Sequence, residues 1–271
     1  MDVASLSKQQ ETQASILELQ KQLGKAQLQK LDSLNARKQL EFIFSRSLLL
    51  FALNRHVNAE QEVDWNQSIS WDIVERPQLP PLVMNSEADS FQFSISHSHS
   101  FVAIACCYRK ENQQHSQQQI GFDIQQTKQF KSFEQGLQAA EYFCHVDELE
   151  GLSALAGEKQ THAFNSTFTQ FWSMKEAFFK AQESSIHNEQ LTRTHFQNCK
   201  LNQANCLSSY LVGQDEQEYQ ITLYNPFLAT DVDSAESAVE VNSVELNLNN
   251  GRLETSLQSQ KLEWQGFCVR Q

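Results

Sequence analysis

A regular hydrophobic pattern lies between Phe171 and Gln182, in the sequence FWSMKEAFFKAQ. Phe171, Met174 and Phe178 recur at positions i, i+3 and i+7. Because this spacing places the apolar side chains on one side of a helix, it predicts an amphipathic helix whose apolar stripe faces a core.

Polar residues follow the same helical period. Trp172, Glu176 and Lys180 succeed one another at steps of four residues, so a carboxylate and an ammonium lie one turn apart on one side of the helix. Taken alone, such a pair is a surface ion pair that stabilises a helix by about 0.2 to 0.5 kcal/mol. A catalytic interpretation therefore needs support from other parts of the chain.

A second stretch, QIGFDIQQ at residues 119–126, predicts a strand because apolar residues occupy every second position. The apolar positions are Ile120, Phe122 and Ile124. Asp123 and Gln125 then point out of the opposite face together.

The rest of the chain mixes helical and strand-like patterns. Helices are predicted for three further segments: 1–36, 37–57 and 139–155. Strands are predicted for six further segments: 91–95, 101–105, 209–212, 219–224, 239–248 and 262–269. Loops are predicted for the proline-containing segment 70–81 and the glutamine-rich segment 109–119.

Length and composition describe an ordinary folded protein. The 271 residues can bury one large core or two smaller ones, and 40% hydrophobic with 20% charged residues is typical of globular chains. No apolar run approaches the roughly 20 residues that span a membrane, and the N-terminus lacks the pattern of a secretory signal. We therefore expect a cytoplasmic protein that does not bind a membrane.

Charge and cysteine usage narrow the possible partners. A net charge of -12 argues against nucleic acid as the main partner, because binding to a phosphate backbone needs a basic face. The six cysteines form no C-x-x-C pair and no spacing suited to zinc. In a reducing compartment most of them should be small buried hydrophobic residues.

The two stretches together resemble a known family, the 4'-phosphopantetheinyl transferases of the surfactin-synthetase-activating (Sfp) type. That family has a G-x-D strand followed, several tens of residues later, by a W-x-x-K-E-x-x-x-K helix. The matching residues occur here in the same order: Gly121 and Asp123, then Trp172, Lys175, Glu176 and Lys180.

The segment FSISHSHSFVAIA, residues 93–105, is similar to a third family signature, a strand that ends in Ser-His before a turn and another strand. The resemblance implies that Ser96 and His97 contact the phosphates of coenzyme A. His99 stands where family members often have glycine, which leaves the turn geometry open. A metal site at His97 and His99 is a weak alternative, because no third ligand lies at a usable spacing.

Three residues outside these signatures are expected to contact coenzyme A on the basis of the resemblance: Arg46, Ser47 and Arg76. The first two lie in the helix predicted at 37–57, and Arg76 precedes a proline in the predicted loop. The alternative that each arginine is simply a solvated surface residue stays open.

The resemblance implies transfer of the 4'-phosphopantetheine arm of coenzyme A to a serine of an apo acyl-, peptidyl- or polyketide-carrier protein, with release of adenosine 3',5'-bisphosphate. Cleaving the pyrophosphate builds negative charge, so the site needs a divalent cation and cationic side chains. Mg²⁺ needs only one or two protein carboxylates besides the phosphates of its ligand. Asp123 and Glu176 meet this requirement, and Gln125, where family members commonly have an acid, is a third candidate ligand.

Chemical roles follow from these residue types. Glu176 is expected to accept the proton of the serine, and Lys180 to neutralise or protonate the leaving phosphate. Lys175 and Lys180 are both expected to contact phosphate.

The implied fold is α/β (α+β), the 4'-phosphopantetheinyl transferase fold, with two pseudo-symmetric α/β subdomains and the active site between them. We expect a helical leader at 1–36, an N-terminal subdomain at 37–119, a C-terminal subdomain at 120–271, and a monomer. The rival function is a catalytically weakened module that binds coenzyme A or a carrier protein, which Gln125 favours. A different Mg²⁺ phosphotransferase has less support, since the chain has no G-x-x-x-x-G-K loop.

Overall fold

The computed structural model describes residues 17, 20–21, 23–57, 72–74, 81–84, 91–99, 101–108, 119–183, 188–200, 203–212, 216–226, 241–249, 252–260 and 265–270. The chain divides into two compact units. Unit 1 comprises residues 1–89 and 238–261, and unit 2 comprises residues 90–237 and 262–271.

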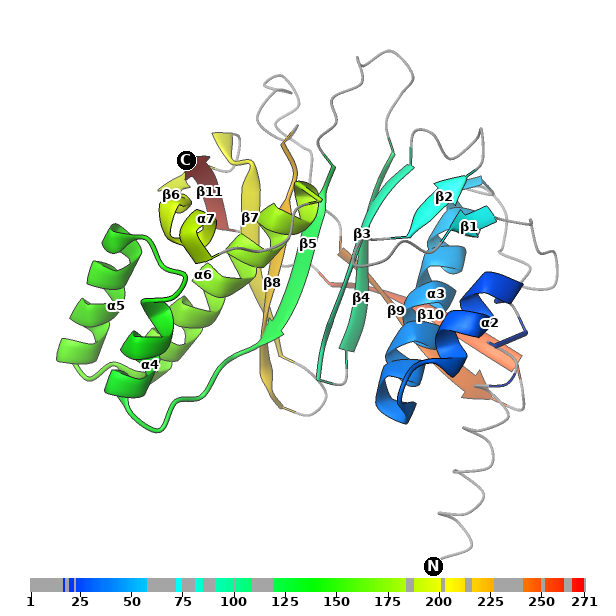
Figure 1. The fold of residues 1–271 in the computed structure, drawn as a ribbon, viewed down its shortest axis with the longest axis horizontal. Coiled ribbons are helices and arrows are strands. Elements are labelled where there is room, and N and C mark those ends of the chain that lie inside the picture. Colours follow the sequence, from blue (N-terminus) through cyan, green and yellow to red (C-terminus); the bar gives the residue numbers. More distant parts are fainter. Residues whose placement is uncertain are drawn as a thin grey trace, which may run out of the picture. The chain divides into compact units, whose positions relative to one another are not determined.

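Unit 1 combines helices with two pairs of antiparallel strands, β1 with β2 and β9 with β10 (Figure 1). Its elements are α2 (Lys25–Asp32), α3 (Ala36–Val57), β1 (Asp72–Val74), β2 (Leu82–Met84), β9 (Val241–Asn249) and β10 (Arg252–Gln260). Leu23 and Leu31 pack with Phe42 and Ile43 to form a small apolar core. The helix predicted at 37–57 is confirmed as α3, and α2 lies within the predicted helical leader.

Unit 2 is built on a five-stranded antiparallel sheet with the strand order β5-β8-β7-β11-β6. Its strands are β5 (Gly121–Gln126), β6 (His195–Cys199), β7 (Cys206–Val212), β8 (Glu218–Tyr224) and β11 (Gln265–Arg270). The strand predicted at 119–126 is thus confirmed as β5, which lies at one edge of this sheet. In the register of β5 with β8, Asp123 is opposite Thr222.

Helix α6 packs on β5 and β8, and Figure 1 shows it crossing one face of the sheet with α4 and α5 beyond it. The helices of unit 2 are α4 (Phe133–Ala140), α5 (Val146–Gly157), α6 (Thr161–Ala181) and α7 (Asn188–Arg193). Phe164, Phe168, Met174 and Phe178 of α6 are buried in the main apolar core. The predicted amphipathic helix is therefore confirmed, and it begins ten residues before Phe171.

The segment 139–155, predicted to be helical, is helical at both ends but is not one continuous helix, because the chain ends α4 and begins α5 within it. His145 caps α5: its ring accepts the Asp147 N–H at 3.3 Å, and the Glu148 carboxylate accepts the His145 N–H at 2.9 Å. Such a capping box starts a new helix. Phe143, in the connection, is buried in the core.

The hairpin of β3 (Phe91–Ser98) and β4 (Phe101–Tyr108) also belongs to unit 2. The domain boundary expected after residue 119 would separate this hairpin from β5. In the structure, however, hydroxyl groups on β3 accept hydrogen bonds from β5. At the tip, His99 has a φ of 54°, in the left-handed region that favours glycine.

Within the residues that the structure describes, no helix has the length and apolar character needed to span a membrane.

Candidate active site

The close approach of α6 to β5 depends on Gly121. A Cβ atom at this position would overlap the backbone carbonyl of Ala177, which is itself fully buried on α6. Only glycine lets a strand and a helix come this near without displacement. The glycine of the G-x-D pattern thus lets the face of β5 that carries Asp123 pack directly against the helix that carries Glu176 and Lys180.

Asp123 and Lys180 form an ion pair, with 2.7 Å between Nζ and Oδ1. The carboxylate of Asp123 is fully buried, whereas the Lys180 side chain is 27% exposed. Lys180 also donates to the Ser96 hydroxyl at 2.9 Å and to the Phe122 carbonyl at 3.3 Å. All three N–H donors of this ammonium therefore have acceptors within the protein.

The second oxygen of Asp123, Oδ2, is buried and has no hydrogen-bond partner in the part of the chain that the structure describes. Glu176 lies nearby on α6, and its pKa is raised above the ordinary 4.5. Burial is the largest cause, the Lys180 ammonium opposes it, and the Asp123 carboxylate adds to it. The site thus holds two coupled carboxylates and one ammonium.

This donor set fits a hard divalent cation. Asp123 Oδ2 is an unpartnered anionic oxygen, and a buried polar atom without a partner is costly unless something else binds it. A cation would also offset the repulsion between the Asp123 and Glu176 carboxylates, which adds to the effect of burial on the pKa of Glu176. Mg²⁺ prefers such oxygen ligands and needs few of them from the protein.

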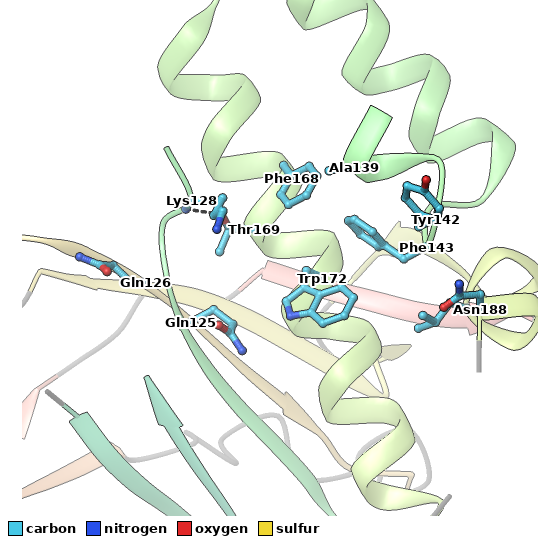
Figure 2. Close-up of a pocket in the computed structure, with 11 residues that line it drawn as sticks. Gln125, Gln126, Lys128, Ala139, Tyr142, Phe143, Phe168, Thr169, Trp172 and Asn188 are labelled. Carbon is cyan, nitrogen blue, oxygen red and sulfur yellow. Dashed lines mark hydrogen bonds between the residues drawn. The ribbon is translucent and has the colours of Figure 1, made fainter. Parts of the chain in front are cut away.

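Gln125 follows Asp123 by two residues on β5 and is half-buried. It lines a cavity of about 520 Å³, and Figure 2 shows the aromatic rings that share this cavity. The full lining is Gln125, Gln126, Lys128, Ala139, Tyr142, Phe143, Phe168, Thr169, Trp172, Asn188 and Leu191. Trp172, the first residue of the helix signature, is therefore a wall of this cavity.

Lys175 lies apart from this group, although it is adjacent to Glu176 in the sequence. Its side chain is fully buried and pairs with Glu148 at 2.8 Å, and it donates to the carbonyls of Leu191 and Thr194. Burial lowers the pKa of this ammonium from its ordinary 10.5, and Glu148 opposes the change. Lys175 thus joins α6 to α5 and to the end of α7, where the sequence suggested a phosphate contact.

Glu148 is the partner that sequence reasoning missed. Its carboxylate accepts the backbone N–H groups of His145 and Phe196 in addition to the Lys175 ammonium. The only sequence signal was its place three residues after His145, the spacing of a capping box.

The other predicted contacts of coenzyme A are placed as follows. Ser96 is buried on β3 beside Asp123, and His97, the next residue on the strand, is exposed. Arg46 and Ser47 are buried on α3 of unit 1, where the Arg46 guanidinium lies 4.6 Å from the Phe42 ring centroid and Ser47 donates to the Ile43 carbonyl. Arg76 lies outside the described residues.

A second group of potential metal ligands consists of His145, Asp147 and His195. The two imidazole rings stack with 4.6 Å between centroids and 8° between planes. Because a metal ligated by two imidazoles lies near the plane of both rings, nearly parallel rings would have to rotate to share one ion. In this arrangement His145 acts as the N-cap of α5.

Residues 119–230 match the family model described as the 4'-phosphopantetheinyl transferase superfamily. The match begins just before β5 and ends after β8, so it contains Asp123, Glu176 and Lys180. No curated protein sequence matches the chain. The part of the chain that carries the candidate site is thus similar to phosphopantetheinyl transferases.

Proposed function

We propose that this protein is an Mg²⁺-dependent 4'-phosphopantetheinyl transferase of the Sfp type. It would transfer the phosphopantetheine arm of coenzyme A to a serine of an apo acyl-, peptidyl- or polyketide-carrier protein and release adenosine 3',5'-bisphosphate. The observation that carries the proposal is the meeting of Asp123, Glu176 and Lys180 at one edge of the sheet. It is supported by the family match over the same residues.

Asp123 and Glu176 would hold the cation, with Gln125 as a further candidate ligand. When bound, Mg²⁺ would supply positive charge that stabilises the developing charge of a pyrophosphate under attack. Lys180 adds fixed positive charge beside Asp123, where it can stabilise the departing phosphate. Since its three N–H groups are already engaged, Lys180 would act by its charge more than as a proton donor.

Glu176 is proposed to accept the proton of the carrier serine. Its raised pKa makes it a stronger base than an exposed glutamate, and its carboxylate makes no hydrogen bond or ion pair with any described residue. A base without a competing partner is available to a substrate hydroxyl.

Contacts of Arg46, Ser47, Arg76 and His97 with the phosphates of coenzyme A stay part of this proposal, as do a monomeric state and a cytoplasmic location. Lys175 is different, because its ammonium already has three acceptors within unit 2. We therefore leave Lys175 out of the phosphate site.

The second candidate function is a module that binds coenzyme A or a carrier protein without transfer. Gln125 favours it, since an amide adds no negative charge for a cation. The two functions differ in metal-dependent turnover. Purified apo-carrier proteins from fatty-acid, polyketide and nonribosomal-peptide systems would be incubated with this protein, coenzyme A and Mg²⁺, and their intact masses measured.

Transferase activity predicts a carrier that gains the mass of one phosphopantetheine group, and no gain in EDTA. Coenzyme A binding without any gain on the three carrier classes would reject the transferase and support the binding module.

A further inference from the structure

β3 packs beside the free edge of β5 through a row of serines, Ser94, Ser96 and Ser98, called here the serine ladder. Their hydroxyl oxygens accept the alternate backbone N–H groups of β5: Phe122 to Ser94 at 2.9 Å, Ile124 to Ser96 at 3.3 Å and Gln126 to Ser98 at 2.9 Å. An edge strand exposes such N–H groups unless they are covered. The serine ladder thus replaces backbone pairing on this side of β5.

Beyond accepting the Ile124 N–H, the Ser96 hydroxyl makes two further hydrogen bonds. It donates to Asp123 Oδ1 at 2.8 Å and also accepts from Lys180 at 2.9 Å. A serine hydroxyl has one donor and two acceptor positions, so all the hydrogen-bonding positions of Ser96 are occupied. The side chain is only 3% exposed.

The direction of the Ser96 hydroxyl is fixed by its partners. Two of them, the Ile124 N–H and the Lys180 ammonium, are donors, so Asp123 Oδ1 is left as the acceptor of the Ser96 proton. Asp123 Oδ1 then accepts hydrogen bonds from both the Ser96 hydroxyl and the Lys180 ammonium, whereas Oδ2 accepts neither of them. Ser96 thereby distinguishes the two oxygens of the carboxylate.

We propose that Ser96 is a positioning residue that fixes the orientation of the Asp123 carboxylate: Oδ1 is held by Ser96 and Lys180, and Oδ2 is left as the oxygen that would bind a cation. Without Ser96, the one partner left for Asp123 Oδ1 among the described residues would be Lys180, whose side chain is long and flexible. The proposal rests on the proposed function, and it differs from the phosphate contact that the sequence resemblance suggests for Ser96.

The two roles of Ser96 predict different kinetics. A serine that binds a phosphate of coenzyme A should raise the KM for coenzyme A when it is replaced by alanine. A positioning serine should instead lower kcat and weaken Mg²⁺ binding, with the KM for coenzyme A little changed. Removing groups that orient metal ligands typically costs about 10- to 100-fold in metal affinity or activity.

The matched control is Ser94→Ala. Ser94 is 4% exposed and accepts a β5 N–H as Ser96 does, but among the described residues its hydroxyl makes no hydrogen bond to Asp123 or Lys180. Both alanine variants lose one hydrogen bond of the serine ladder, and Ser96→Ala also loses the hydrogen bonds to Asp123 and Lys180. Ser96→Cys keeps the shape of the side chain with a weakly bonding thiol, which covers the case that Ser96→Ala does not fold.

The experiment measures Mg²⁺ affinity by calorimetry and transfer kinetics for the wild type, Ser94→Ala, Ser96→Ala, Ser96→Cys and Ser96→Thr. We expect Mg²⁺ affinity and kcat to fall at least about tenfold in the Ala and Cys variants, with recovery in Ser96→Thr, which restores a hydroxyl, and no such loss in Ser94→Ala. Equal losses in Ser94→Ala and Ser96→Ala would overturn the proposal, as would a change confined to the KM for coenzyme A. If the wild type transfers nothing, the proposed function fails, and the calorimetry still decides whether Ser96 positions Asp123.

Discussion

Lys180 Nζ lies 2.7 Å from Asp123 Oδ1, although the two residues are 57 positions apart in the chain. One comes from the last turn of α6 and the other from the edge strand β5. The pair neutralises one oxygen of a fully buried carboxylate and leaves the second without a partner among the described residues. This asymmetry is the basis of the proposed cation site.

Glu176→Gln should stabilise the protein at neutral pH in the absence of a divalent cation. The native-state pKa of Glu176 is raised, so its contribution to stability is fully present below the ordinary 4.5 and is lost as pH rises through the native value. The amide of the Glu176→Gln variant stays neutral at every pH and therefore avoids this loss of stability. We expect a gain of about 1 kcal/mol, or about 2 to 4 °C in Tm.

Thermal melts in EDTA at pH 7.5 and pH 4 measure this effect. The advantage of Glu176→Gln should become smaller at the lower pH, where the wild-type carboxyl is mostly protonated in both the folded and the unfolded state. A variant that is less stable than the wild type at pH 7.5 would contradict the assigned pKa direction.

Gly121→Ala should separate β5 from α6. The added methyl group would overlap the Ala177 carbonyl, and a backbone atom cannot move aside as a flexible side chain can. Overpacking of this kind costs about 1 to 3 kcal/mol or more. Urea denaturation measures the loss, and Gly151→Ala is the control because a Cβ there meets no atom within 4 Å. Equal stability of the two variants would show that the close approach is not required.

Lys175→Met should destabilise unit 2 by about 3 to 5 kcal/mol, because it leaves the buried carboxylate of Glu148 without its counter-charge. Adding Glu148→Gln should recover part of the loss, since the amide is neutral and its oxygen can still accept a backbone N–H group. Free energies of unfolding for both single variants and the double variant form the test. Additive losses in the double variant would mean that the two side chains do not act as a pair.

His99→Gly should relieve the positive φ at the tip of the β3–β4 hairpin. A residue with a Cβ atom in the left-handed region costs roughly 1 to 2 kcal/mol, partly offset by the greater freedom of glycine in the unfolded chain. We expect a net gain below about 1 kcal/mol, read from chemical denaturation. His99→Ala keeps the strained backbone and should show no gain; equal gains in both variants would assign the effect to the imidazole.

The periodic parts of the fold could be predicted from the sequence. The stripe of Phe171, Met174 and Phe178 and the alternation around Asp123 predicted α6 and β5, since each period places apolar residues on a buried face. The elements β1, β2, β6, β10 and α7 were missed, and β1 lies within the segment 70–81 that was predicted to be a loop. In β6, HFQNC, apolar residues do not alternate in a clear pattern, and pairing with β11 decides its conformation.

The candidate residues Asp123, Glu176 and Lys180 were predicted from the order and spacing of the two signatures. The structure brings these three side chains together. The place of Lys175 was not predictable, because nothing in its spacing shows that Glu148, 27 residues earlier, turns back to meet it. The serine ladder was visible as alternating serines, but its function depends on β5 presenting a free edge.

The most direct test of the central claim is the rate of phosphopantetheine transfer by Asp123→Asn and Glu176→Gln beside the wild type, at saturating coenzyme A and Mg²⁺. Both substitutions keep the shape of the side chain and remove its charge. The account predicts that each lowers kcat by at least about 100-fold, while circular dichroism shows both variants to be folded. Wild-type turnover in either variant would contradict the assignment of the active site to this pair of carboxylates.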